Sequence, residues 1–267
     1  MRLLNLLTVL VLASSCSKKT SPSGDDTSSP TTIRLMTYNI HHGVPVGGAN
    51  TDVHLDAIAS VINTQKPDLV ALQEVDSMTT RAPVDEAKEL ARLTGMHYFF
   101  SRTLDYEGGK YGDAVLSRYP ILATQHYPLP MPDPSGEARA VGIVTVQPAE
   151  GVEIDFAVTH LDLASNREAQ VKALVNISNS SRNPLILGGD LNADPSSEYI
   201  TTLKQAFQLA CESGCPLTAP SDNPSKTIDY IALNPAAAKR FHVVSYNVIK
   251  GIYASDHLPL IEYVTVQ

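Results

Sequence analysis

The sequence predicts one α/β domain of mixed β-sheets covered by helices, preceded by an N-terminal export segment. From about residue 32 to the end, short apolar or alternating runs typical of strands alternate with segments of helical periodicity. No internal repeat or second linker divides this region. The 267 residues, with 43% hydrophobic and 18% charged content, are enough for one large core.

The first residues are expected to form an export signal. Arg2 precedes an apolar run at residues 3–13, which is too short to span a bilayer comfortably. Small residues and Cys16 follow, and the pattern resembles a bacterial lipobox, which would be cleaved before Cys16 and lipidated there. A plain signal peptide with an incidental cysteine is the alternative. We expect a signal peptide over residues 1–15 and a lipid anchor in the cell envelope, on its periplasmic or outer face.

A flexible tether is expected between this anchor and the folded domain. Residues 16–31 contain the candidate lipidated cysteine and a stretch rich in Ser, Thr and Pro without apolar periodicity, and the domain then covers residues 32–267. Cys211 and Cys215 are the other two cysteines. Export implies an oxidising compartment, which favours a short-loop disulfide; a zinc site is the alternative, disfavoured because there is no second cysteine pair.

Periodicity gives the expected elements of the domain in order. Strands are expected at residues 32–38, 68–73, 97–101, 113–117, 121–127, 140–147, 152–160, 184–189, 228–233, 241–249 and 259–266. Helices are expected at residues 52–66, at 85–94 with a stop at Gly95, from a cap at Asn166 to about 179, and from a cap at Ser196 or Ser197 to about 208.

Polar residues adjoin the ends of several expected strands. They are Asn39, Glu74, His160, Asp190, Asn192, Asp229, Asp256 and His257. Each one alone is more typical of a turn residue or of a structural histidine than of a functional site. If the strand ends converge, several carboxylates share one cleft and need a cation, and oxygen ligands favour Mg²⁺, Mn²⁺ or Ca²⁺ over zinc. The Gly188–Gly189 pair is expected to turn the backbone tightly towards the ligand.

Seven segments occur in an order that resembles a known superfamily. They are TYNIHHG, ALQEVD, YGDAVLSRYP, THLD, GGDLNADP, IDYI and SDHLPL. The set is similar to the motifs of the endonuclease/exonuclease/phosphatase superfamily, over almost all of residues 32–267. This resemblance implies a DNase I-like four-layer α/β sandwich of two packed mixed sheets flanked by helices. It also implies a divalent-metal-dependent hydrolase of phosphoester bonds.

The resemblance implies a metal and water site. Glu74 corresponds to the principal metal carboxylate, and Asn39 to its neighbour, which binds the metal directly or through water. Asp256 corresponds to a carboxylate that holds metal or water. Asp190 and Asn192 correspond to the pair that activates the attacking water and holds the phosphate.

The resemblance also implies a set of phosphate contacts. His257, oriented by Asp229, would lie at the scissile phosphate, and His160 would contact a phosphate oxygen. Arg139 stands in the place of a phosphate-binding arginine; the alternative is an exposed strand arginine. These contacts would meet negative charge that grows in the transition state.

Two positions depart from the expected motifs. Asp113 stands where the bacterial subgroup usually has asparagine. We expect it to hydrogen-bond His160 and keep that ring protonated; the alternative is a solvated carboxylate at the cleft rim. Thr227 precedes IDYI where arginine or lysine is expected, which weakens the case for a basic clamp.

Further residues are expected near the cleft. Tyr106, Tyr111 and Arg81 lie on expected loops and would line it. Arg81 would contact a second phosphate or be exposed, and exposure is the favoured interpretation. One of His41 and His42 would face the cleft, and neither is assigned as a ligand.

Charge and composition select among the functions of such a hydrolase. The net charge of −8 and the pI near 5.4 argue against non-specific binding of long nucleic acid. We therefore expect a monomeric Mg²⁺-dependent (or Mn²⁺- or Ca²⁺-dependent) phosphodiesterase or phosphatase for small or lipid head-group phosphoesters. A secreted endonuclease for DNA or RNA is the alternative. A catalytically silent binding lipoprotein is disfavoured because the polar set is complete.

Overall fold

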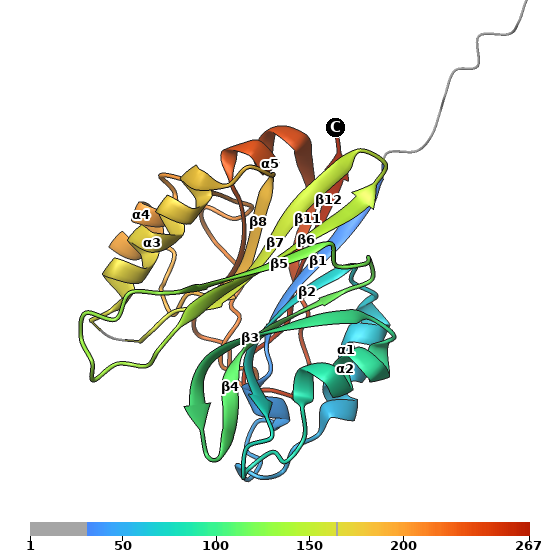
Figure 1. Ribbon diagram of the computed structural model, residues 1–267, viewed down its shortest axis with the longest axis vertical. Helices are drawn as coiled ribbons and strands as arrows, with labels where there is room; N and C mark the ends of the chain where they lie inside the picture. The colour runs from blue at the N-terminus through green and yellow to red at the C-terminus, as the bar shows by residue number, and fades with distance from the viewer. Residues whose placement is uncertain (1–30, 164) are drawn as a thin grey trace, which may run out of the picture.

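The computed structural model describes residues 31–163 and 165–267, which form two six-stranded β-sheets flanked by helices (Figure 1). The expected signal peptide, the Cys16 anchor and nearly all of the tether lie outside the described residues. Within the described part of the chain, no helix is long and apolar enough to cross a membrane.

The first sheet contains the strands of the N-terminal half and the last two strands. Its order is β11 (Phe241–Val248), β12 (Leu260–Val266), β1 (Thr32–Asn39), β2 (Leu69–Ser77), β4 (Gly109–Ser117) and β3 (His97–Tyr106). The second sheet has the order β5 (Ala123–Pro128), β6 (Ala140–Ala149), β7 (Val152–His160), β8 (Leu185–Asp190), β10 (Asp229–Leu233) and β9 (Gln208–Leu209). Each sheet is mixed: β1 pairs parallel to β2 and β7 parallel to β8, and the other pairings are antiparallel.

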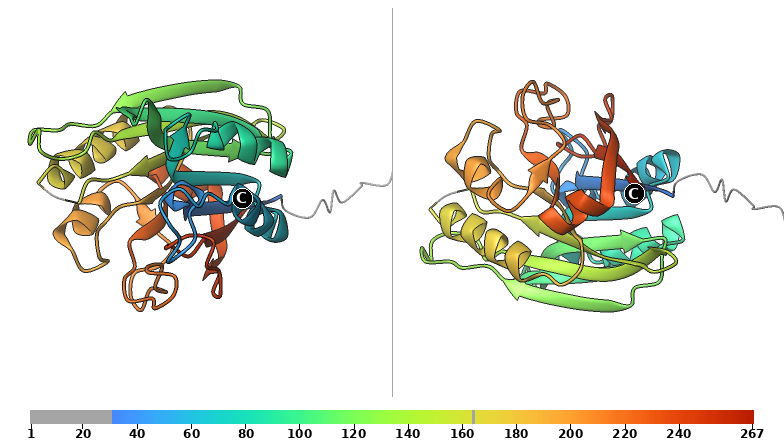
Figure 2. Two further views of the ribbon diagram at one scale, coloured as in Figure 1. Left: turned by 90° about the horizontal axis from the view of Figure 1, so that it is seen from below. Right: turned by 90° about the horizontal axis from the view of Figure 1, so that it is seen from above.

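The helices cover the outer faces of the sheets in two pairs. The helical segments are η1 (His41–Gly43), α1 (Leu55–Gln65), α2 (Glu86–Thr94), α3 (Arg167–Ser180), α4 (Glu198–Leu203) and α5 (Pro235–Arg240). The views of Figure 2 keep the yellow α3 on the opposite side of the molecule from the blue-green α1 and α2. This arrangement confirms the predicted four-layer sandwich.

Three apolar clusters separate the four layers. The central cluster fills the space between the sheets and includes Leu35, Phe156 and Ile231. The second packs α1 and α2 on the first sheet, and the third packs α3 and α4 on the second sheet. Strands with both faces buried read as continuous apolar runs, which explains why segments such as 185–187 lack alternation.

The glycines at the end of β8 have a different role from the expected one. Both lie within the extended strand, so the predicted tight turn is wrong. A Cβ on Gly188 would lie 2.8 Å from the Cβ of Ala71 in the opposite sheet, and one on Gly189 would lie 2.5 Å from the carbonyl oxygen of Thr159. Gly188 is therefore required because the two sheets approach closely here, and Gly189 because the neighbouring strand β7 of its own sheet leaves no room for a Cβ.

Most expected helix boundaries are confirmed. Asp85 caps α2 by accepting a hydrogen bond from the Lys88 amide, and Gly95 ends it in the left-handed conformation. Ser197 caps α4, which ends at residue 203 rather than at about 208. Asn166 precedes α3, but its side chain bonds Asp162 and the Asp133 backbone instead of capping the helix.

The region after α4 contains the predicted disulfide. Cys211 and Cys215 are joined, which makes the zinc alternative wrong. The motif departure at Thr227 also has a local explanation: its hydroxyl donates to the carbonyl oxygen of Pro216. Thr227 thus stabilises this loop.

One carboxyl group is buried in the first sheet away from the cleft. Glu262 on β12 is fully buried, and neither of its carboxyl oxygens has a hydrogen-bond partner among the described residues. Burial raises its pKa from 4.5 to about 8. The folded protein therefore holds a proton on Glu262 at neutral pH that the unfolded chain releases.

This proton makes stability depend on pH. Because the folded pKa lies above the unfolded one, the free energy of unfolding is expected to fall as the pH rises from about 4.5 to about 8. Glu262→Gln should remove this dependence and stabilise the protein at pH 8, by an amount on the order of 1 kcal/mol per unit of pKa difference. Urea unfolding at pH 5 and pH 8 measures it, with exposed Glu153→Gln as the control. Parallel pH dependence of both variants and the wild type would contradict this assignment.

Candidate active site

The parallel pairs explain why polar residues from distant parts of the chain converge. In the first sheet, Asn39 pairs with Gln73, so Asn39 and Glu74 emerge together at the carboxyl ends of β1 and β2. In the second sheet, His160 pairs with Asp190, and Asp229 pairs with Asp190 from the other side. In each sheet, the polar residues at the strand ends therefore lie next to one another.

Strands that run antiparallel to β1 and β7 add to this edge the residues that lie just before each of them begins. β12 runs antiparallel to β1, with Leu260 opposite Thr37, so Asp256 and His257 lie at the same edge. β6 runs antiparallel to β7, with Val141 opposite Thr159, which places Arg139 beside His160. Strand ends and strand starts thus meet on one side of the sandwich.

A pocket of about 530 Å³ lies at this edge. Its lining includes Glu74, Arg139, His160, Asp190, Asn192 and His257 from the predicted set. Asn39, Asp113 and Asp229 are buried next to these residues, and the side chain of Asp256 is 42% exposed. The structure therefore brings the predicted site residues of both sheets to one place.

Glu74 reaches the pocket through a local distortion of β2. The pairing of β2 with β4 shifts between Leu72 and Val75, which is a β-bulge, and Glu74 has a left-handed φ of 58°. Asn39 Nδ2 donates to Glu74 Oε1 at 2.9 Å and to Asp190 Oδ2 at 3.2 Å. The amide thus ties together carboxylates from the two sheets.

The donor set around Glu74 suits a hard divalent cation. Asn39 contacts Glu74 through its amide nitrogen while its Oδ1 accepts the His41 backbone amide, and the Asp256 carboxylate lies 4.0 Å from the His41 ring. Carboxylate and amide oxygens are the ligands that Mg²⁺, Mn²⁺ and Ca²⁺ bind. Repulsion among Glu74, Asp190 and Asp256 would fall when such a cation binds. These residues fit the predicted metal role.

His257 lies between two aspartates. Its Nδ1 is 2.9 Å from Asp229 Oδ2, and its Nε2 is 3.7 Å from Asp190 Oδ2. Burial disfavours the charged ring, but Asp229 outweighs burial, and the pKa of His257 is raised to about 10. His257 is therefore a protonated imidazolium that faces Asp190.

Asp190 is the carboxylate on which these contacts converge. Burial, and then the charge of Asp229, raise its pKa to about 7, although His257 opposes them. Its Oδ1 accepts the Asn192 backbone amide at 2.9 Å, and Asn192 adopts a left-handed φ of 48°. A carboxyl group with a pKa near neutrality is suited to accept a proton from water.

His160 is neutral, contrary to the prediction. Arg139 can only donate hydrogen bonds, and its Nη1 lies 2.9 Å from His160 Nδ1. Asn192 Nδ2, also a donor, lies 2.9 Å from the other ring nitrogen, Nε2, which is 3.5 Å from Asp190 Oδ2. An imidazolium carries a proton on both ring nitrogens and could accept from neither donor, so the ring is neutral. Burial, Arg139 and His257 all hold the pKa of His160 well below its usual value.

Asp113 does not make its predicted contact. The His160 ring contacts Arg139 and Asn192 instead, and Asp113 Oδ2 has no hydrogen-bond partner among the described residues. Asp113 is 1% exposed, so the alternative of a solvated rim carboxylate is also wrong. Burial raises its pKa to about 8, although Arg139 opposes this shift.

Arg139 and Arg81 are both less exposed than the interpretation of each as a surface residue predicts. Arg139 is buried, and its Nη1 also pairs with Glu137 at 3.0 Å. The side chain of Arg81 is only 12% exposed and forms a two-point ion pair with Asp76. The favoured interpretation of Arg81 as an exposed residue is therefore wrong.

Arg81 forms one wall of the pocket with two tyrosines. Its guanidinium lies 4.6 Å from the ring centre of Tyr106 and 5.8 Å from that of Tyr111. All three line the pocket, as predicted, but Tyr106 and Tyr111 lie on β3 and β4 rather than on the expected loops. Asp76 neutralises the arginine, so this wall is planar and weakly polar rather than a strong anion site.

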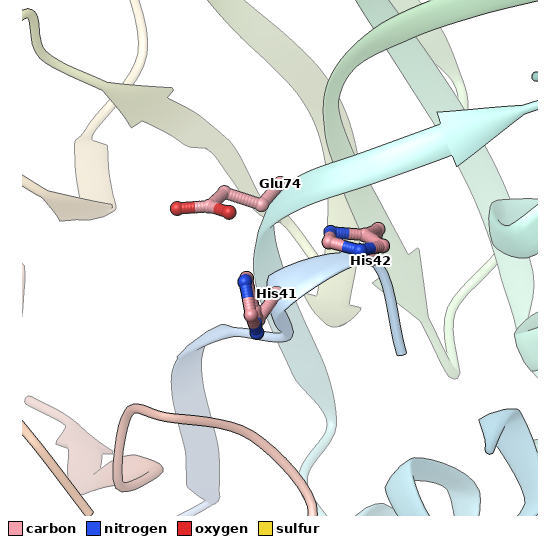
Figure 3. A group of neighbouring side chains, drawn as sticks. All are labelled: His41, His42 and Glu74. Atoms are coloured by element: carbon pink, nitrogen blue, oxygen red, sulfur yellow. The ribbon is translucent and has the colours of Figure 1, made fainter. Parts of the chain in front are cut away.

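His41 and His42 have no predicted ligand role, and only one of them is expected to face the cleft. Both line the pocket beside Glu74 (Figure 3). They follow β1 directly in the segment TYNIHHG, and this position after a strand end is the signal that could have identified them.

Comparison with known proteins identifies the class of this protein. The chain matches the Endonuclease/Exonuclease/phosphatase family over residues 36–257, and it belongs to this family. It is 27% identical over 248 residues to the uncharacterized protein YbhP of Escherichia coli K12, covering 85% of this chain and 94% of that protein. The family defines it as a hydrolase of phosphoester bonds, and members of the family generally depend on divalent metals.

Solved structures agree with this assignment. An endonuclease/exonuclease/phosphatase from Beutenbergia cavernae has a TM-score of 0.70 and 25% identity, covering 88% of this chain and 72% of its own. A mannosyl-6-phosphatase of Bacteroides thetaiotaomicron has a TM-score of 0.71 and 17% identity, covering 87% and 99%. The second similarity shows the fold alone.

The contact between Asp229 and His257 gives a direct prediction. Asp229→Asn should lower the pKa of His257 and leave its ring poorly oriented, and kcat should fall by about 10²–10⁴. Steady-state kinetics with bis(p-nitrophenyl) phosphate measure the effect. Asp194→Asn, in an exposed turn after the site, is the matched control. Wild-type kcat in a folded Asp229→Asn protein would exclude this role.

Proposed function

We propose that the protein is a divalent-metal-dependent phosphodiesterase or phosphatase that acts on small or lipid head-group phosphoesters at the cell envelope. The observation that supports it is the position of Asp190. This buried carboxylate faces a pocket and lies within 3.7 Å of Asn39, His160 and His257 side-chain nitrogens. A proton acceptor, an imidazolium and a cation site thereby lie around the same space.

Each residue has a distinct task in this proposal. A divalent ion held by Glu74, Asn39 and Asp256 would neutralise the phosphate and leaving-group oxygens. Asp190 accepts the proton of the attacking water. His257 donates from its charged ring to a phosphate oxygen.

Asn192 and the His160–Arg139 pair complete the phosphate contacts. Arg139 Nη1 and Asn192 Nδ2 each lie 2.9 Å from a ring nitrogen of His160, so the neutral imidazole is held in place beside Asp190. Asn192 Nδ2 also donates to the carbonyl oxygen of Leu161, which fixes the orientation of the amide. These donors are positioned before substrate binds, which is the arrangement that stabilises developing charge.

The dimensions of the pocket and the net charge of the chain favour a small substrate. A volume of about 530 Å³ is in the range of small-molecule sites. The chain has 28 acidic and 20 basic residues, a balance that disfavours a long polyanion. Arg81, Tyr106 and Tyr111 would contact the group esterified to the phosphate.

Turnover of model esters tests the reaction. Bis(p-nitrophenyl) phosphate and p-nitrophenyl phosphate should be hydrolysed with Mg²⁺ or Mn²⁺, and EDTA or His257→Ala should abolish turnover. Choline and inositol phosphate esters should then be cleaved faster than plasmid DNA or RNA. Preferential cleavage of nucleic acid would favour the endonuclease alternative, and no turnover with any ester would favour a silent binding lipoprotein.

The tyrosine wall predicts an effect on substrate binding. Tyr106→Ala should remove the ring stacked on Arg81 and raise KM more than it lowers kcat, because the ring contacts the ester group rather than the phosphate. Kinetics with an aryl phosphodiester measure both constants. Tyr127→Ala, an exposed tyrosine on β5 away from the pocket, is the control. A loss confined to kcat would place Tyr106 in the chemistry instead.

The envelope anchor is tested separately. The N-terminal segment supports lipidation of Cys16, followed by a tether long enough to hold the domain away from a bilayer. Cys16→Ser should abolish incorporation of labelled fatty acid and shift the protein from the membrane fraction to the soluble fraction. A membrane-bound Cys16→Ser protein would refute the anchor without affecting the catalytic proposal.

A further inference from the structure

His41, His42 and Glu74 form a compact cluster at the pocket. Each offers one potential ligand atom, and these three atoms lie within 4.8 Å of one another. Figure 3 shows the two imidazoles of η1 beneath the Glu74 carboxylate of β2. Two imidazoles and a carboxylate at such separations can bind one metal ion.

The tautomer of His42 is fixed by a backbone contact. Its Nε2 lies 3.3 Å from the carbonyl oxygen of Asn50, which can only accept a hydrogen bond. Nε2 therefore carries the proton, and the neutral ring keeps a lone pair on Nδ1. A hydrogen bond from the far ring nitrogen to a carbonyl is the usual support of a metal-binding histidine.

The Nδ1 atoms of both rings are without partners. His42 is 1% exposed, and the Nδ1 atoms of His41 and His42 are buried with no hydrogen-bond partner among the described residues. His41 Nδ1 lies 4.0 Å from Asp256 Oδ1, which is too far for a hydrogen bond. Buried polar atoms normally have partners, so these two nitrogens indicate a missing ligand.

The backbone holds all three residues in an uncommon conformation. The φ angles of His41, His42 and Glu74 are 46°, 40° and 58°, in the left-handed region. Such a conformation is strained for a residue other than glycine, and it occurs preferentially at active sites and ligand clamps. Three residues with strained backbone conformations therefore direct their side chains to one point.

We propose that His41, His42 and Glu74 bind a transition-metal cation of the Mn²⁺, Co²⁺ and Zn²⁺ class. Imidazole nitrogen suits these ions, whereas Mg²⁺ selects oxygen ligands. Glu74 is shared with the oxygen site of Asn39, so the two positions adjoin. The site adds nitrogen ligands to a pocket that the sequence alone assigns to a hard cation.

Metal binding without substrate tests this site. Chelator-treated protein is titrated with Co²⁺, monitored by its visible d–d absorption, and with Zn²⁺ by calorimetry. His41→Asn and His42→Asn remove the imidazole while keeping a residue that tolerates positive φ. Each should weaken Co²⁺ binding by about 10–100-fold or more, since loss of an outer partner alone has an effect of this size.

His54→Asn is the matched control, because His54 is an exposed histidine that pairs with Asp52 outside the pocket. Its Co²⁺ affinity should equal that of the wild type. Pulsed EPR of the Mn²⁺-loaded wild-type protein should show ¹⁴N coupling, a readout that does not depend on how the variants fold. Unchanged Co²⁺ affinity in the folded variants, or no ¹⁴N coupling, would overturn the site. Neither result depends on hydrolysis, so failure here is distinguishable from failure of the proposed function.

Discussion

Burial of the Asp190 carboxylate is the constraint on which the rest of the site depends. The group is almost fully buried, faces the charge of Asp229 and has a pKa raised to about 7. A buried anion is stable only when donors or cations surround it. The backbone amide of Asn192, the amide of Asn39 and the ring of His257 supply these contacts. The residues that stabilise the buried Asp190 carboxylate are therefore the residues that a bound phosphate would contact.

The topology satisfies this constraint with few special features. Two parallel strand pairs, one per sheet, place Asn39 beside Glu74 and His160 beside Asp190. The sheets must then approach closely enough for the Asn39 amide to reach both carboxylates. Gly188 permits this approach, since a Cβ there would lie 2.8 Å from the opposite sheet. Packing between the sheets thus sets the distance across the site.

The sequence predicted the architecture, and it predicted polar side chains that the structure brings together at one pocket. Strand ends with Asn, Asp, Glu and His are local features, and mixed sheets bring them together. Contacts that depend on burial were not predictable. The predicted contact of Asp113 with His160 is absent because Arg139, which directly precedes β6, reaches His160 through strand register. Arg81 was placed on the surface because nothing in the sequence indicates its ion pair with Asp76, which depends on the folded loop.

The two histidines near Asp190 show how environment assigns different roles to the same side chain. His257 faces Asp229 at 2.9 Å and is charged, whereas His160 faces Arg139 at 2.9 Å and is neutral. Only His257 can therefore supply a positive charge to a phosphate, and His160 can only orient and donate one hydrogen bond. If both rings were charged, two imidazolium ions would face Asp190 and it would be a poorer base; if both were neutral, neither ring would supply a positive charge beside that carboxylate. The Asp229 partner keeps His257 charged, and the Arg139 partner keeps His160 neutral. Asp190 therefore stays basic, and one imidazolium remains available to the phosphate.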